Sequence, residues 1–236
     1  MDYALKVLSV LPWADWAAVV WFFAAWTGYA AFAHRRSQAQ PSVLALTNLE
    51  RRRWMMQTTY RDVRVVDGVV VQNLSSSPSF FASTTILIIG GLLAVLGTSE
   101  KATDLVREIP FAARTSELIF DLKLFLLMGI FIYAFFRFTW SLRQYTFGAL
   151  LVAAAPEPPQ FEAVPGSRER FAQRAGGVMG LAAEAFNTGL RAYYMAFAAI
   201  GWFFSPLIFA FATAGVIYVL YRREFHSAVL AVLRTD

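Results

Sequence analysis

The sequence lacks cysteine and has only two histidines among its 236 residues. Without cysteine there can be no disulfides, thiolate metal ligands or cysteine nucleophiles. We expect no histidine-based metal site, because His34 and His226 are far apart in the chain. Charged residues make up only 16% of the chain, against about 25% in an average soluble protein. These absences exclude several kinds of catalytic and metal-binding protein.

Residue sets that would identify a reaction are also missing. The glycines at 176, 177 and 180 are not followed by the Lys-Ser/Thr pair of a phosphate-binding loop. No paired spacing typical of acid–base catalysis occurs among the carboxylates Asp62, Asp67, Glu162, Glu169 and Glu184. We therefore predict no catalytic residues, no cofactor and no metal, and the chain is not expected to be an enzyme.

Long hydrophobic runs are abundant instead, since 58% of the residues are hydrophobic. Four runs cover residues 13–33, 79–97, 118–138 and 192–221. Each can cross a hydrocarbon core about 30 Å thick, which takes roughly 20 helical residues. The sequence therefore predicts an all-α polytopic membrane protein with four transmembrane helices in a single membrane domain, residues 1–236. Pro206 lies inside the fourth run, and we expect a kink near Ser205.

Two of the connecting segments are predicted to be cytoplasmic amphipathic helices. The first, residues 42–66, begins after Pro41 and has apolar residues at helical spacing among several arginines. The second covers residues 168–190. We expect a turn at Asp67-Gly68 and an approach to the second span at residues 75–79. The Pro-rich residues 155–165 are predicted to be a stiff linker.

The basic residues predict which side of the membrane each connection occupies. Lys and Arg are more numerous in the first and third connections than in the other extramembrane segments. By the positive-inside rule, those connections are cytoplasmic and both termini lie outside, as in a bacterial inner membrane. The formal net charge of +5 suggests contact with anionic lipids at the cytoplasmic face, and no motif points to nucleic acid.

The third apolar run contains two cations on one predicted helical face. Lys123 and Arg137 share this face with Leu127, Ile130 and Ala134. Intramembrane charges are candidates for a functional pathway, so the two cations could attract an anion or bind lipid phosphates. Alternatively they snorkel towards the two interfaces or pair within the protein. Arg191, beside two tyrosines, is expected to be an interfacial anchor.

Several local patterns together resemble an uncharacterised family of four-pass membrane proteins from bacteria and plants, a domain of unknown function numbered 599. The resemblance covers most of the chain, and it implies architecture only, because no established activity can be carried over. The residues that carry it are Arg51-Arg52-Arg53-Trp54-Met55 with Arg61, Asp62 and Asp67, then Phe80-Phe81-Ala82-Ser83-Thr84, Leu122-Lys123-Leu124, Phe135-Phe136-Arg137-Phe138, Asn187-Thr188-Gly189-Leu190-Arg191-Ala192-Tyr193-Tyr194, Trp202 with Pro206, and Arg222-Arg223-Glu224-Phe225.

We expect many of the polar residues to meet in one cytoplasmic layer, which is either a functional surface or a structural network. The leading functional hypothesis is a non-enzymatic accessory or scaffold protein that forms a homo-oligomer or joins a membrane complex. The alternative is an oligomeric channel or transporter for an ion or small anion, and a membrane-embedded enzyme comes third. The candidate residues for the layer or a pathway are Arg51, Arg52, Arg53, Arg61, Asp62, Asp67, Ser83, Thr84, Lys123, Arg137 and Arg191.

Overall fold

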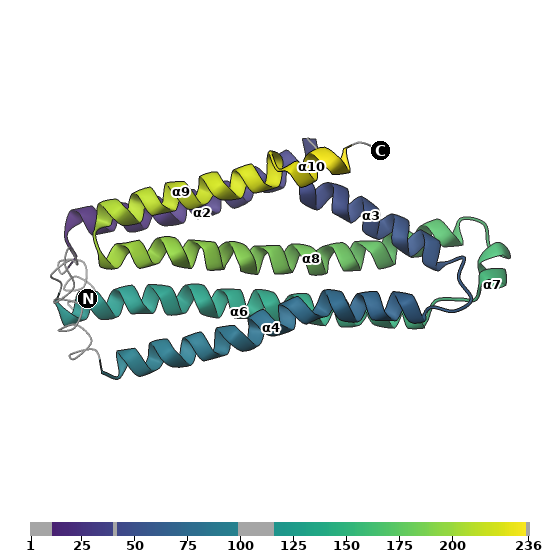
Figure 1. Cartoon of the computed structure of the whole chain (residues 1–236), viewed down its shortest axis with the longest axis horizontal. Helices are drawn as coiled ribbons and strands as arrows, with labels where there is room; N and C mark the ends of the chain where they lie inside the picture. Colours follow the sequence, from purple (N-terminus) through teal and green to yellow (C-terminus); the bar gives the residue numbers. More distant parts are fainter. Residues whose placement is uncertain (1–10, 40–41, 99–115, 235–236) are drawn as a thin grey trace, which may run out of the picture. The chain divides into compact units, whose positions relative to one another are not determined.

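A computed structural model describes residues 11–39, 42–98 and 116–234, and within these ranges the regular structure is helical. Four segments are long and apolar enough to cross a membrane, namely Trp13–Ala33, Val65–Leu96, Glu117–Ala153 and Pro206–Leu233. The prediction of an all-α protein with four such helices is confirmed. The helices (Figure 1) are α2 (Trp13–Ala39), α3 (Val43–Thr58), α4 (Val65–Leu96), α6 (Glu117–Ala153), α7 (Pro158–Glu162), α8 (Ser167–Ile200), the 3₁₀ turn η1 (Gly201–Phe203), α9 (Pro206–Phe225) and α10 (Ala228–Leu233).

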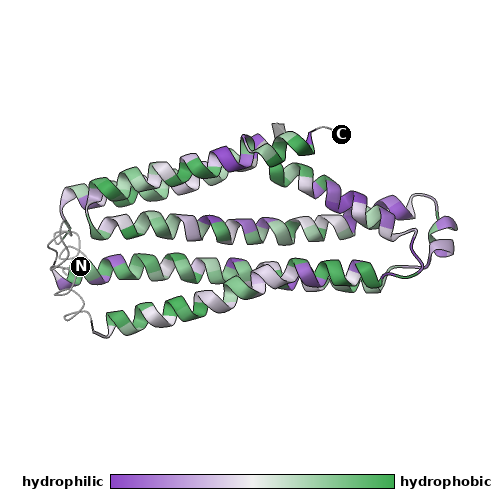
Figure 2. Ribbon diagram, in the orientation of Figure 1, coloured by the Kyte–Doolittle hydropathy of each residue, from purple (hydrophilic) through white to green (hydrophobic). Residues whose placement is uncertain are grey.

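The described residues fall into two compact units. Unit 1 takes its described residues from Met1–Arg36, Thr85–Tyr133 and Arg191–Arg223, and unit 2 takes the remainder. Helices α4, α6 and α8 each continue without a break from one unit into the other. Figure 2 shows hydrophobic residues along most of α2, α6 and α9, whereas hydrophilic residues are frequent on α3 and α7.

In unit 1, α2 and α9 run in the same direction. The indole N–H of Trp21 donates to the carbonyl of Ala210 at 3.2 Å. Further along both helices, the rings of Phe32 and Tyr221 lie 6.2 Å apart. Because the contacts advance together along the two helices, their C-terminal arginine pairs, residues 35–36 and 222–223, lie at the same end of unit 1.

Helix α8 enters unit 1 in the opposite direction to α2. The guanidinium of Arg191 lies 5.7 Å from the ring centre of Tyr29. Beyond the end of α8, the indole of Trp202 contacts Asp15, near the start of α2. As α8 advances, its partners on α2 move backwards, so the helices are antiparallel.

The apolar run at 192–221 is two helices rather than the single kinked span that we predicted. Helix α8 ends at Ile200, and α9 returns alongside it after η1 (Figure 1). The hydroxyl of Ser205 accepts a hydrogen bond from the amide of Ile208 at 3.1 Å, and Pro206 is the first residue of α9. Ser at the N-cap followed by Pro at N1 is a helix start. Gly201 permits the tight reversal, since a Cβ there would lie 3.2 Å from Ile208.

Helix α4 also begins earlier than the sequence suggested. It starts at Val65, so Asp67-Gly68 lies in its first turn and Pro78 lies in its interior. An acidic residue in the first turn is favoured by the helix dipole. The hydroxyls of Ser75 and Ser76 donate to backbone carbonyls of the same helix at 2.8 and 2.7 Å. The hydroxyls of these serines therefore have hydrogen-bond acceptors within the helix. The predictions of a turn at residues 67–68 and of a non-helical approach at residues 75–79 are wrong.

Other boundaries shift in the same way. Helix α3 begins after the predicted Ser42 cap, whose hydroxyl accepts from the amide of Ala45 at 3.1 Å, but it ends at Thr58 rather than at residue 66. Helix α6 continues to Ala153, well past the predicted end at 138. The Pro-rich linker contains the short helix α7, which begins at Pro158 because proline suits the first helical turn.

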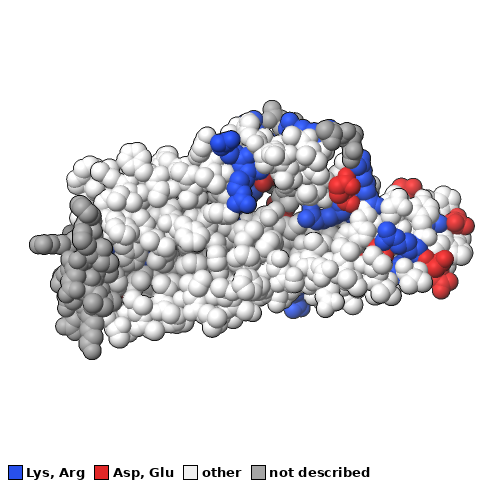
Figure 3. Space-filling view, in the orientation of Figure 1, with Lys and Arg blue, Asp and Glu red and all other residues white. Residues whose placement is uncertain are grey.

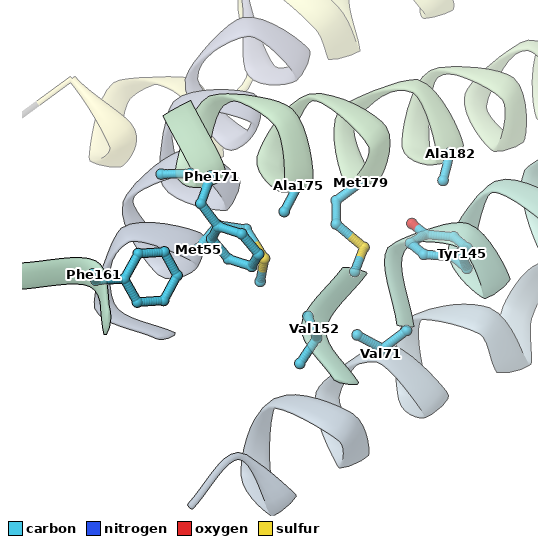
Figure 4. Close-up of a cluster of buried hydrophobic side chains, with 10 residues drawn as sticks. Met55, Val71, Tyr145, Val152, Phe161, Phe171, Ala175, Met179 and Ala182 are labelled. Atoms are coloured by element: carbon cyan, nitrogen blue, oxygen red, sulfur yellow. The ribbon is translucent and has the colours of Figure 1, made fainter. Parts of the chain in front are cut away.

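Side chains from five helices build the hydrophobic core of unit 2. Figure 4 shows Met55 of α3 and Met179 of α8 among buried side chains of α4, α6 and α7. Helix α8 comes closest to α3 and α6 at glycine residues, which have no side chain. A Cβ on Gly176 would lie 2.8 Å from the Cα of Arg52, and one on Gly189 would lie 2.5 Å from the ring of Phe138. These glycines set the spacing of α8 against α3 and α6.

Candidate functional site

The face of α6 that carries Lys123 is buried, as the helical spacing predicts. Lys123 is 2% exposed, and Ile130 and Ala134 on the same face are 3% and 0% exposed. Lys123 therefore lies inside the helix packing of unit 1, and this favours pairing within the protein over snorkelling to a lipid interface.

Two aromatic rings lie near the ammonium group of Lys123, and the carboxylate of Asp15 acts on it electrostatically. Its Nζ atom lies 5.6 Å from the ring centre of Trp202 and 5.9 Å from that of Phe203, within the range of a cation–π interaction. The indole N–H of Trp202 donates to Oδ1 of Asp15 at 2.6 Å. Asp15 is 8% exposed, and its negative charge acts on Lys123 electrostatically. Chemically, the group is a buried cation stabilised by a carboxylate and two aromatic faces.

A second carboxylate, that of Asp121, lies near the start of α6, the helix that carries Lys123. Oδ1 of Asp121 is buried and has no hydrogen-bond partner among the described residues. The basic residues Lys6, Lys101, Arg107 and Arg114, which belong to the segments expected outside, are not among the described residues. Within the described part of the chain, no three His, Asp or Glu side chains gather as metal ligands would.

Two tyrosines of α8 hold polar contacts within unit 1. The hydroxyls of Tyr193 and Thr85 lie 2.7 Å apart, joining α8 to α4. Tyr194 accepts a hydrogen bond from the guanidinium of Arg223. The guanidinium of Arg191 lies over the ring of Tyr29. Thr85 is fully buried, whereas the neighbouring candidates Ser83 and Thr84 are not, so sequence reasoning chose the less central members of this hydroxyl cluster.

In unit 2, Asp67 is the centre of a buried polar cluster. It is 0% exposed, and its Oδ1 accepts from the indole N–H of Trp54 at 2.6 Å and from the hydroxyl of Thr58 at 3.1 Å. The same oxygen accepts a hydrogen bond from Arg61, with which Asp67 forms a salt bridge. Oδ2 of Asp67 is buried without a hydrogen-bond partner among the described residues. The cluster ties the end of α3 to the start of α4.

Two arginines that the sequence did not single out stabilise the turn between α3 and α4. Arg64 donates to the carbonyl of Ala155 at 2.7 Å and also to that of Pro156. Arg168 donates to the carbonyl of Thr59 at 2.6 Å and lies 4.0 Å from the ring centre of Tyr60. Their acceptors are mainly backbone carbonyls, which carry no residue-specific signal in the sequence.

The arginines of α3 have three different environments. Burial lowers the pKa of Arg51, whose guanidinium donates to Asn48 at 2.9 Å. Arg52 is exposed, and its backbone packs against α8. Arg53 forms an exposed salt bridge with Glu50 at 2.7 Å. Figure 3 shows charged side chains of both signs on the face of unit 2 near α3 and α7.

The remaining candidate residues make fewer hydrogen bonds to other helices. Asp62 and Ser83 are exposed, and the hydroxyl of Thr84 donates to the carbonyl of Phe80 within its own helix. Nε of Arg137 is buried without a hydrogen-bond partner among the described residues. Of the eleven predicted residues, the structure brings Arg61 and Asp67 into direct contact. Lys123 and Arg191 belong to unit 1, and the other nine belong to unit 2.

The fold defines a polytopic α-helical membrane protein. Buried charged side chains such as Lys123 and Asp67 contact other side chains of the same chain. The chain belongs to the family described as "Protein of unknown function, DUF599", whose model matches residues 17–229. No curated protein and no solved structure shows significant similarity to it.

Proposed function

We propose that the protein is a non-enzymatic accessory or scaffold subunit of the membrane, acting as a homo-oligomer or within a larger complex. The environment of Lys123 is the observation that carries this proposal. A conducting path requires polar groups that face water, whereas Lys123 is 2% exposed and contacts Trp202. Two grooves described in unit 1, between α2 and α9 and between α2 and α6, are lined mostly by apolar and aromatic side chains.

Helix α4 supports the oligomeric part of the proposal. Leu87 is 75% exposed, and a Cβ added at Gly90 or Gly91 would meet nothing within 4 Å. Small exposed residues let a second transmembrane helix approach closely. This face of α4 is therefore the contact that we propose for a second copy or a partner subunit.

The arginine pairs support a revised orientation in a bacterial inner membrane. Arg35, Arg36, Arg222 and Arg223 lie at one end of unit 1, which the positive-inside rule assigns to the cytoplasm. We propose that α8 is a fifth crossing that returns the chain to the outer face before α9. The C-terminal end of α9 is then cytoplasmic, and the N-terminal end of α2 is outside. Anionic lipids would contact the arginine-rich end.

Extraction from native membranes into lipid nanodiscs tests the scaffold proposal. We expect a defined homo-oligomer or a partner subunit at fixed stoichiometry, measured by native mass spectrometry and protein identification. Gly90→Leu should weaken the association, whereas Gly215→Leu should not, because Gly215 is also an exposed helical glycine with open space. A monomer without stoichiometric partners would contradict the proposal.

A channel or transporter for a small anion is the second candidate, because a buried lysine in a membrane helix is a usual sign of a substrate pathway. Halide flux into proteoliposomes distinguishes the two functions. The scaffold proposal expects flux equal to that of protein-free vesicles. Flux that disappears in Lys123→Met, with the variant still folded, would replace it with the transport function.

A further inference from the structure

The groove between α2 and α9 of unit 1 has an apolar body and a cation at one end. It has a volume of about 500 Å³. The rings of Phe32 and Tyr221 form part of its wall, and the guanidinium of Arg36 lies 5.5 Å from the first ring centre and 5.6 Å from the second. Arginine is thus held by cation–π contact where the groove ends.

Small residues create this groove. Its wall includes Ala24, Gly28 and Ala214 between larger aromatic side chains. A Cβ added at Gly28 would meet nothing within 4 Å. The space is therefore left by missing side chains on facing helices.

The dimensions of the groove match one membrane leaflet. Its wall on α2 extends from Trp21 to Phe32, which is about 16 Å of helix at 1.5 Å per residue. Half of a hydrocarbon core about 30 Å thick is about 15 Å. An acyl chain in this groove would therefore span a single leaflet, with its headgroup beside Arg36.

The charges near this end of unit 1 complement an anionic headgroup. Arg35 and Arg222 are exposed, and they flank Arg36 and Arg223 in the sequence. Guanidinium groups bind phosphate through several N–H donors in a fixed geometry.

We propose that the α2–α9 groove binds one acyl chain of an anionic glycerophospholipid, and that Arg36 contacts the lipid phosphate. This lipid site does not depend on the scaffold function. The neighbouring α2–α6 groove, about 520 Å³ in volume, provides an internal comparison. It is also mostly apolar and aromatic, but in the described part of the chain no cation–π contact is made to the rings that line it, whereas Arg36 lies over two rings of the α2–α9 groove. That groove is expected to hold acyl chains without preference for headgroup charge.

Native mass spectrometry of the full chain in mild detergent tests the proposal. Equal amounts of phosphatidylglycerol and phosphatidylcholine are added, and the bound lipids are counted. The wild type should retain phosphatidylglycerol preferentially. Arg36→Gln should reduce that preference about fivefold, the effect of removing one cation near an anionic surface. Inorganic phosphate should not displace the lipid, because the acyl chain supplies much of the binding.

Two leucine substitutions test the role of the groove itself. Gly28→Leu should fill the α2–α9 groove and abolish the preferential retention. Gly129→Leu is the matched control, because Gly129 lines the α2–α6 groove and also has open space around an added Cβ. Equal loss in both leucine variants, an unchanged preference in Arg36→Gln, or displacement by inorganic phosphate would overturn the proposal. If Gly28→Leu does not fold, the Arg36→Gln measurement still decides.

Discussion

Replacing Asp67 by alanine should destabilise the protein, because its carboxylate organises the junction of α3 and α4. The substitution removes the acceptor for Trp54, Thr58 and Arg61 in one step. It also removes a buried oxygen that has no hydrogen-bond partner among the described residues, which offsets part of the loss.

The size of the destabilisation depends on which acceptor each of the three donors finds once the carboxylate is removed. The indole N–H of Trp54 loses a hydrogen bond to a charged group, which contributes about 1.5–3 kcal/mol. The side chain of Arg61 is 42% exposed, so water replaces its partner and the loss is about 0–1 kcal/mol. The hydroxyl of Thr58 keeps the carbonyl of Trp54 at 3.0 Å as an alternative acceptor. The free energy of unfolding should therefore fall by about 2–4 kcal/mol.

Thermal unfolding in detergent, followed by tryptophan fluorescence, measures this change. For a protein of this size about 1 kcal/mol corresponds to roughly 2–4 °C, so Tm should fall by about 4–16 °C. Asp67→Asn keeps one acceptor oxygen and should give a smaller decrease. Asp62→Ala removes an exposed carboxylate from the preceding turn and should change stability by less than about 0.5 kcal/mol. Equal effects at positions 62 and 67 would refute the reasoning.

Three further substitutions test other parts of the packing by the same thermal assay. Gly189→Ala introduces a Cβ 2.5 Å from an aromatic ring and should cost about 1–3 kcal/mol, whereas Gly177→Ala has open space and should not destabilise. Ser205→Ala removes the cap of α9 and should cost about 1 kcal/mol; an unchanged Tm would contradict the capping role. Lys123→Met removes a buried cation on which Asp15 acts electrostatically and should change Tm, and adding Asp15→Asn should offset part of that change. Failure of this rescue would show that the two charges do not interact.

The membrane-spanning helices could be predicted because length and apolar composition determine them directly. The boundaries of the helices were harder to predict, because the same capping residues can have more than one interpretation. The start of α3 was predicted correctly because Pro41-Ser42 indicates a helix start. Ser205 has the same capping role, but it lies inside a continuous apolar run, so the proline after it was interpreted as a kink. The Ser-Pro pair itself was the available signal.

The polar contacts were less predictable because they depend on tertiary packing. Asp15 and Lys123 are more than 100 residues apart, and nothing in their spacing links them. Asp67 was selected for its place in a basic segment, and its pairing with Arg61 follows from the turn between α3 and α4. The roles of Arg64 and Arg168 escaped the sequence reasoning, since both donate mainly to backbone carbonyls.

Helix α8 shows why counting apolar runs underestimates the proposed number of membrane crossings. In unit 1 its Ala192, Ala196 and Ala199 are almost fully buried, whereas Phe197 is 65% exposed, so one face of the helix packs closely against other helices. A buried transmembrane helix gains stability from close packing of small residues and needs few large apolar side chains. Such a helix has low hydropathy, yet it reverses the side on which the chain continues. With α8 as a fifth crossing, the two arginine pairs lie on the same side, as the positive-inside rule requires, whereas a four-crossing chain places them on opposite sides.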